Sequence, residues 1–167
     1  MARTKSLTVY EGARNLLVNC ARVAKDERLA IICEDPSLGW YDGIGPKAVY
    51  ETAKQFGLNT TLISVNGPTP DRALPTNAIK ALALNDHTIF FARLGDQSRF
   101  SLKTNTKAPI MCYAYSAASL ASSYGQFDYK AFFDFKLAID QTYENSRRIR
   151  ITCPLGTDIT GEYTVNA

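Results

Sequence analysis

The sequence is poor in the residues that most often perform catalysis, because it holds one histidine, His87, among 167 residues. Its four cysteines are Cys20, Cys33, Cys112 and Cys153, and no pair has the spacing of a zinc or redox motif. No apolar run approaches the ~18 residues of a membrane helix, and no signal-peptide stretch follows the N-terminal basic residues. We therefore expect free, buried thiols, no complete metal site and a soluble cytoplasmic protein.

Charge of one sign is also scarce, since the formal net charge is +3. Most basic residues are scattered, which argues against nucleic acid as a partner. The exception is the cluster Arg147, Arg148 and Arg150, which we interpret as the solvated edge of a strand. Nothing in the composition calls for a membrane partner either.

What is present is a strand around which the chain is organised. Residues Leu29–Cys33 form an apolar run without polar alternation, so both faces of this strand should be buried, as in a central parallel strand. Three further apolar runs, 59–65, 88–92 and 108–113, are predicted to be its neighbours. We expect residues 1–147 to form an α/β domain with a flavodoxin- or Rossmann-like parallel sheet of about four strands and helices on both faces.

The intervening segments have helical signals. Thr8 and Glu11 match a capping box, and Pro46 suits the first position of a helix that Gly57 can end. Residues 127–147 form the longest helical pattern. Its apolar stripe of Phe132, Phe135, Ile139 and Tyr143 is predicted to belong to the core.

The pattern changes at residue 148. Residues 148–153 and 159–165 alternate between polar and apolar side chains around a turn, which predicts an antiparallel hairpin. A lone hairpin is only marginally stable in water. We therefore expect residues 148–167 to lie on a sheet edge, to pair with a second copy in a homodimer, or to begin another domain.

A glycine-rich loop, Gly39–Gly45, precedes the helix at Pro46 and could place backbone amides around an anion. Its spacing matches neither the dinucleotide fingerprint nor the phosphate loop. The carboxylate of Asp42 would also repel phosphate. A structural loop is therefore the interpretation that we favour over a phosphate site.

Ligands of open parallel sheets bind at the carboxyl ends of the strands. Asp35 and Arg93 follow the first and third strands, and Gly43 and Gly45 lie in the glycine-rich loop. We take these four residues as candidates for ligand binding and none as catalytic. His87 is at the opposite end of the third strand, where a structural role is expected.

The closing segment resembles a known family. Residues 150–160, with their Gly-Thr-Asp turn, look like the segment that links the two domains of aminopeptidase T-like metallopeptidases (thermophilic metalloproteases), and residues 20–28 resemble a phrase near their start. That family is related in fold to 2,5-dihydroxypyridine dioxygenases. Asp158 of the turn is our fifth candidate for ligand binding.

The resemblance implies an N-terminal, non-catalytic domain. In this family the ligands of a divalent metal (zinc, cobalt or iron) lie in a larger C-terminal domain, so no catalytic or metal-binding residue is transferred to this chain and no cofactor is expected in it. We expect a part of a metal-dependent enzyme that hydrolyses peptides when intact, whose C-terminal domain this chain lacks. A ring-cleaving dioxygenase of the same fold and a stand-alone module for a small ligand are the alternatives.

Overall fold

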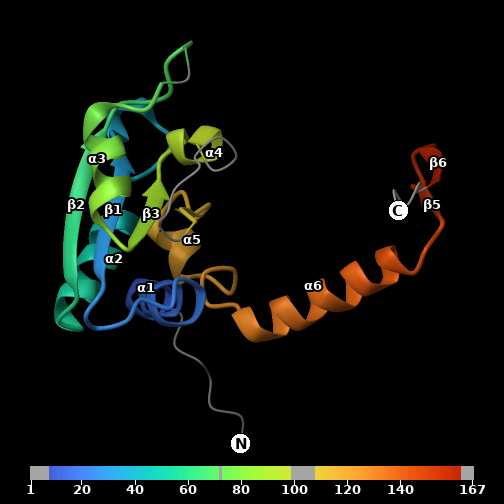
Figure 1. The fold of residues 1–167 in the computed structure, drawn as a ribbon, viewed down its shortest axis with the longest axis horizontal. Coiled ribbons are helices and arrows are strands. Elements are labelled where there is room, and N and C mark those ends of the chain that lie inside the picture. Colours follow the sequence, from blue (N-terminus) through green and yellow to red (C-terminus); the bar gives the residue numbers. More distant parts are fainter. Residues whose placement is uncertain (1–7, 72, 99–107, 163–167) are drawn as a thin grey trace, which may run out of the picture. The chain divides into compact units, whose positions relative to one another are not determined.

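The computed structural model describes residues 8–71, 73–98 and 108–162 (Figure 1), which belong to two compact units, residues 1–127 and 128–167. In chain order the elements are α1 (Val9–Asn15), the π-helical η1 (Leu16–Cys20), β1 (Arg28–Glu34), the 3-10 turn η2 (Pro36–Leu38), α2 (Ile44–Gln55), β2 (Asn59–Val65), α3 (Thr76–Leu84), β3 (His87–Phe91), α4 (Leu94–Ser98), β4 (Ile110–Met111), α5 (Ala117–Ala121), α6 (Tyr129–Glu144), β5 (Arg148–Thr152) and β6 (Asp158–Glu162).

The first unit contains a four-stranded sheet in the order β2-β1-β3-β4, in which every neighbouring pair is parallel. Arg28 pairs with Asn59 and Glu34 with Val65, so β1 and β2 are in register over their whole length. The antiparallel pair β5-β6 follows in the second unit. The predicted fold class, a parallel α/β sheet followed by an antiparallel hairpin, is confirmed.

Helices cover both faces of this sheet. Leu29 and Ile31 of β1 point into a core shared with α1, η1, α2 and α5, whereas Ala30 and Ile32 point into a core shared with α3 and Leu94 of α4. All four side chains are completely buried. The continuous apolar run of β1 therefore has the cause that the sequence indicated, which is burial on both faces.

Several element boundaries differ from the sequence-based expectation. Helix α2 begins at Ile44, two residues before Pro46, because the side chain of Asp42 accepts the first amides of the helix. Strand β4 is only two residues long. The polar stretch after β3 contains the short helix α4, and residues 99–107 lie outside the described residues.

The helix α1 is capped as predicted, since the Thr8 hydroxyl accepts the Glu11 amide at 3.2 Å. Its Gly12 faces the backbone of α5: a Cβ at this position would lie 1.9 Å from the Leu120 carbonyl oxygen. A Cβ at Gly125 would lie 2.0 Å from the same oxygen. Two glycines therefore let three segments of backbone meet at one carbonyl.

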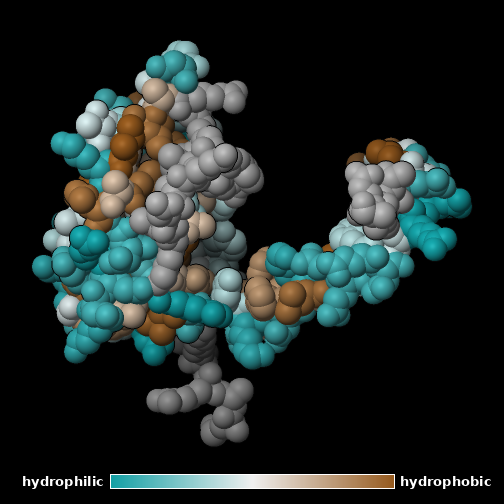
Figure 2. Space-filling model, in the orientation of Figure 1, coloured by the Kyte–Doolittle hydropathy of each residue, from teal (hydrophilic) through white to brown (hydrophobic). Residues whose placement is uncertain are grey.

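The second unit contains the helix α6 and the hairpin β5-β6. Helix α6 is capped by Asp128, whose carboxylate accepts the amides of Lys130 and Ala131. The predicted apolar stripe is present on α6 (Figure 2), but no side chain of this helix is buried, so the expectation that it forms core is not met in this structure. The expected domain boundary after residue 147 stays a prediction. Within the described ranges no helix combines the length and apolarity needed to cross a membrane.

Candidate functional site

The strand order creates one position at which connections leave in opposite directions. From β1 the chain passes through α2 to β2 on one side, and from β2 it passes through α3 to β3 on the other side of β1. This switch point lies between the neighbouring strands β1 and β3. In open α/β sheets ligands bind at such a point, outside the carboxyl ends of the two strands. The residues that end β1 and follow β3 therefore lie where a ligand would bind.

Glu34 and Arg93 meet at this point. The Glu34 side chain is completely buried, and its Oε1 accepts from Nε and Nη2 of Arg93 at 2.8 and 2.6 Å. The backbone amide of Arg93 donates to Oε2 at 2.9 Å. One buried carboxylate therefore fixes both the backbone and the guanidinium of Arg93.

The guanidinium remains partly open to solvent. The Arg93 side chain is 32% exposed, and its Cζ lies 4.5 Å from the centre of the Trp40 ring, which is itself half exposed. This cation–π contact adds a second constraint on the guanidinium. The arrangement presents an oriented hydrogen-bond donor beside an aromatic face, which suits a small polar or aromatic ligand.

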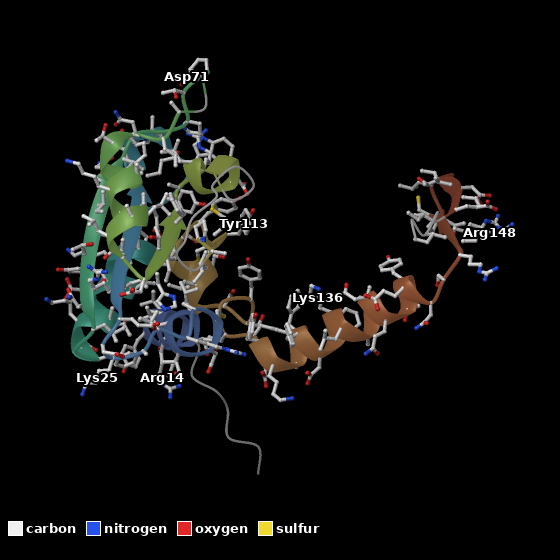
Figure 3. All side chains as sticks on the ribbon, viewed as in Figure 1. Arg14, Lys25, Asp71, Tyr113, Lys136 and Arg148 are labelled. Atoms are coloured by element: carbon white, nitrogen blue, oxygen red, sulfur yellow. The ribbon has the colours of Figure 1, made fainter. Side chains whose placement is uncertain are left out.

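A groove opens next to Arg93 along the loop between β2 and α3. It encloses about 620 Å³ and is lined by Ser64–Gly67, Thr69–Asp71, Ala73–Pro75, Asn77 and Leu94. Gly67 connects the groove with the switch point, since a Cβ there would lie 2.8 Å from Arg93 Nη2. Asp71 lies at the tip of this loop (Figure 3), where hydrogen bonds from the Thr69 hydroxyl and the Ala73 amide lower the pKa of its carboxyl.

The glycine-rich loop has its own internal anion. Oδ1 of Asp42 accepts the amides of Ile44 and Gly45 at 2.9 and 3.0 Å, and Oδ2 accepts the amide of Ala117 at 2.6 Å. Asp42 therefore binds the first amides of both α2 and α5, where an external phosphate would have to compete with it. This geometry agrees with the structural interpretation of the loop.

The other sequence-based candidates have structural partners. Gly43 precedes α2 with φ 69°, and a Cβ there would lie 2.6 Å from the Pro36 ring. Asp35 caps the 3-10 turn η2, and hydrogen bonds from Ser37 lower the pKa of its carboxyl. Asp158 lies in the second unit, where Arg150 donates two hydrogen bonds to it at 2.8 and 2.7 Å and lowers its pKa.

Of the five candidates, Asp35, Gly43, Gly45 and Arg93 lie in segments that follow strands β1 and β3, and Arg93 combines an oriented side chain with an adjoining groove. Their role in binding stays a prediction. Sequence reasoning missed Glu34, Trp40 and Gly67. A charged residue ending the most apolar strand was the available signal for Glu34, whereas the contact between Trp40 and Arg93 has no local sequence signal.

His87 lies at the other end of the strands, where it begins β3. Its side chain is 4% exposed, and Nε2 lies 2.8 Å from Oε2 of Glu27, which also accepts the Ala24 amide at 2.7 Å. His87 is therefore buried and hydrogen-bonded, as a structural histidine would be, and its structural role stays a prediction. Across the described residues, no three His, Cys, Asp or Glu side chains are grouped as they would be to hold a metal ion.

Comparison with known proteins yields a structural neighbour. No family model and no curated protein sequence matches the chain. Among solved structures, 2,5-dihydroxypyridine dioxygenase from Pseudomonas putida KT2440 is similar, with a TM-score of 0.66 and 11% sequence identity over 97% of this chain and 49% of the dioxygenase chain.

At this identity the similarity shows the fold alone. It supports the relation in fold to 2,5-dihydroxypyridine dioxygenases, whereas the resemblance to aminopeptidase T-like enzymes gains no support from these comparisons. The chain spans about half the length of the enzyme that it matches, and what it shares with that part of the enzyme is its α/β fold.

Proposed function

We propose that this chain serves as a non-catalytic α/β domain of a larger, metal-dependent enzyme. The supporting observation is that the similarity covers 97% of this chain but only 49% of the dioxygenase. In an enzyme of that size, the remaining half is available to hold the divalent metal and most of the reacting groups. The α/β domain would help to wall the substrate cleft and to hold subunits together.

The activity of the whole protein is proposed in two versions. Ring cleavage of a hydroxylated pyridine comes first, because the structural neighbour is a 2,5-dihydroxypyridine dioxygenase. Peptide hydrolysis is the alternative, and it rests only on the resemblance of residues 150–160 to aminopeptidase T-like enzymes. Both versions place the metal chemistry outside the residues described in this chain.

One experiment tests the domain role and the activity together. The 167-residue chain and the longest form isolated from its natural source would be compared by metal analysis, oxygen uptake with 2,5-dihydroxypyridine, and release of nitroaniline from leucine p-nitroanilide. We expect the longer form to retain iron, zinc or cobalt and to turn over one substrate. Metal-dependent turnover by the 167-residue chain alone would contradict the proposal.

A second candidate function is binding of a small organic ligand at the switch point. The specific observation in its favour is the oriented, partly exposed guanidinium of Arg93 between Trp40 and the groove at Gly67. Trp40 is the only tryptophan in the sequence, so its fluorescence reports on this site without a label.

The test is a titration with a panel of organic acids, hydroxypyridines and nucleosides. A ligand should change the Trp40 emission saturably, and Arg93→Gln should weaken its binding about tenfold or more, because a charge-assisted hydrogen bond is lost. The matched control is Arg28→Gln, whose ion pair with Asp86 lies at the other end of β1. No response to any compound at millimolar concentration would argue against this function.

A further inference from the structure

The outer edge of the sheet at β2 presents a row of backbone groups. The Asp35 amide donates to the Val65 carbonyl, so Val65 directs its backbone groups toward β1. The backbone groups of successive residues in a strand point to alternate sides. Thr60, Leu62 and Ser64 therefore direct their amides and carbonyls away from β1, in the plane of the sheet. Among the described residues, the side-chain amide of Asn77 donates to the Ser64 carbonyl of this outer row at 3.1 Å.

This edge lacks the features that usually prevent strand pairing. Natural sheets protect their edges with charged residues, proline, bulges or short strands. The seven residues of β2, Asn59–Val65, include no charged residue and no proline. Strand β4, at the other edge of the sheet, is two residues long, and the hairpin strands have Arg148, Arg150, Asp158 and Glu162 on them.

Apolar side chains flank the same edge. Leu62 is 39% exposed on the face of β2 opposite to that of Val65. On α3, Asn77 reaches the Ser64 carbonyl, and Leu84 lies on the same side of the helix because it is seven residues further along. Leu84 is 60% exposed, and Figure 2 shows apolar side chains gathered over α3. The outward backbone groups of β2 are therefore flanked by an exposed apolar side chain on each face of the sheet, Leu62 on one and Leu84 on the other.

We propose that β2 pairs antiparallel with β2 of a second copy of this chain, so that the two sheets become continuous. A two-fold axis at Leu62 places Leu62 opposite its own counterpart and Thr60 opposite Ser64 of the partner. In this register each outward residue of one strand faces an outward residue of the other, as antiparallel hydrogen bonding requires. No like charges meet along the strand, so its sequence is complementary to itself.

The inference does not depend on which activity the whole protein has, and it differs from pairing through the hairpin. Pairing through β5 or β6 would place the charged side chains of that hairpin along the interface. Pairing through β2 uses uncharged residues only. The two arrangements also protect different backbone amides, so experiment can separate them.

Cross-linking tests the register. Leu62→Cys, in a Cys153→Ser background that removes an exposed native thiol, should form a disulfide-linked dimer on oxidation, because paired Cα atoms lie about 5.5 Å apart. The matched control is Ser64→Cys, on the same face of the strand two residues away. Its counterpart would be displaced by four residues, roughly 14 Å along the strand, which is too far for a disulfide.

Cross-linking by Leu62→Cys together with its absence in Ser64→Cys supports the proposal. Equal cross-linking of both variants, cross-linking of Ser64→Cys alone, or none at all overturns it. Should either variant fail to fold, hydrogen exchange of the unmodified 167-residue chain decides. We expect the Thr60 and Leu62 amides to exchange more slowly as protein concentration rises, and exchange at these amides that does not depend on concentration overturns the proposal.

Discussion

At the scale of single residues, Glu34 is the least expected feature of this molecule, since it places a carboxylate in a fully buried position at the end of the central strand. Its two oxygens are bonded to one arginine from the segment after β3. A buried ion pair of this kind contributes less to stability than to position, because desolvation of the charges offsets most of their attraction. Its effect here is to hold the guanidinium of Arg93 at the switch point.

Removal of Glu34 and removal of Arg93 should lower the free energy of unfolding by different amounts. We expect Glu34→Ala to lower the free energy of unfolding by about 3 kcal/mol, because Arg93 can regain water through its exposed part. Arg93→Ala should cost more, because a fully buried carboxylate would then lose its counter-charge. Urea denaturation measures both.

The double variant is the control for this pair. Glu34→Ala with Arg93→Ala should be more stable than Arg93→Ala alone, since no buried charge is left. Strict additivity of the two single losses would show that the ion pair does not act as a unit.

Cys112 gives the fold a dependence on alkaline pH. Burial raises the pKa of its thiol from the ordinary value of 9.0 to about 11. Between these two values the folded chain binds more protons than the unfolded chain, so stability should fall as pH rises from 9 to 11. This difference between the two pKa values corresponds to a loss of about 2–3 kcal/mol in the free energy of unfolding.

The measurement is thermal unfolding of the wild-type chain and of Cys112→Ala from pH 7 to 11. Burial also raises the pKa of Tyr41, so the variant should retain part of the slope. The stability gap between the two proteins should narrow with rising pH. A gap that stays constant across this range would contradict the assignment.

At the scale of secondary structure, one carboxylate organises two helices. Asp42 accepts the first amides of α2 and also an amide of α5, which comes from a segment far along the sequence. We expect Asp42→Ala to lower the free energy of unfolding by about 2 kcal/mol, at the upper end of the range for a helix cap. Helix α2 would lose the acceptor of its first two amides, and α5 would lose the acceptor of the Ala117 amide while keeping the bond from the Ser119 amide to Ser116.

Asp35→Ala is the matched control, since the Asp35 carboxylate caps only the short turn η2. Its effect on the urea midpoint should be clearly smaller than that of Asp42→Ala. Equal effects of the two variants would mean that the bond of Asp42 to α5 adds nothing to stability.

Local patterns in the sequence predicted the strands β1 and β2 well. The predicted run 59–65 coincides with β2, the run Leu29–Cys33 lies within β1, and Thr8 caps α1 as expected, because these signals act within a few residues. The predicted start of α2 at Pro46 was wrong by two residues, because Asp42 extends the helix toward its N-terminal side, to Ile44.

The site was less predictable, because sequence signals act within a few residues and the site is built from distant segments. Arg93 was identified from its position after a strand, but Glu34, Trp40 and Gly67 act through contacts between segments that are distant in the sequence. No spacing rule connects residues on different strands. Asp35, Gly43 and Gly45 were selected for plausible reasons, and each has an evident structural role in capping or turn formation.

At the scale of the whole molecule, the two units differ in how much they bury. The first unit has two apolar cores around β1 and β3, whereas no described residue from 128 to 162 is buried. Local opening requires less free energy where few apolar contacts are broken. The units should therefore differ strongly in backbone protection.

Hydrogen exchange read by mass spectrometry measures this difference. We expect peptides from β1 and β3 to exchange slowest and peptides from α6, β5 and β6 to exchange by several orders of magnitude faster. Exchange in α6 as slow as in β1 would show that this helix is covered in solution, and a cover for its apolar stripe would then have to be identified.

The meeting of Gly12, Gly125 and the Leu120 carbonyl has a consequence for sequence variation. These glycines stand at opposite ends of the first unit's sequence, yet each leaves space that only a hydrogen atom can occupy. In a library of all single substitutions, these two positions should tolerate almost nothing, even alanine, although neither touches the switch point. Distant relatives of this chain should accordingly be recognisable by this pair of small residues even where the ligand-facing residues have diverged.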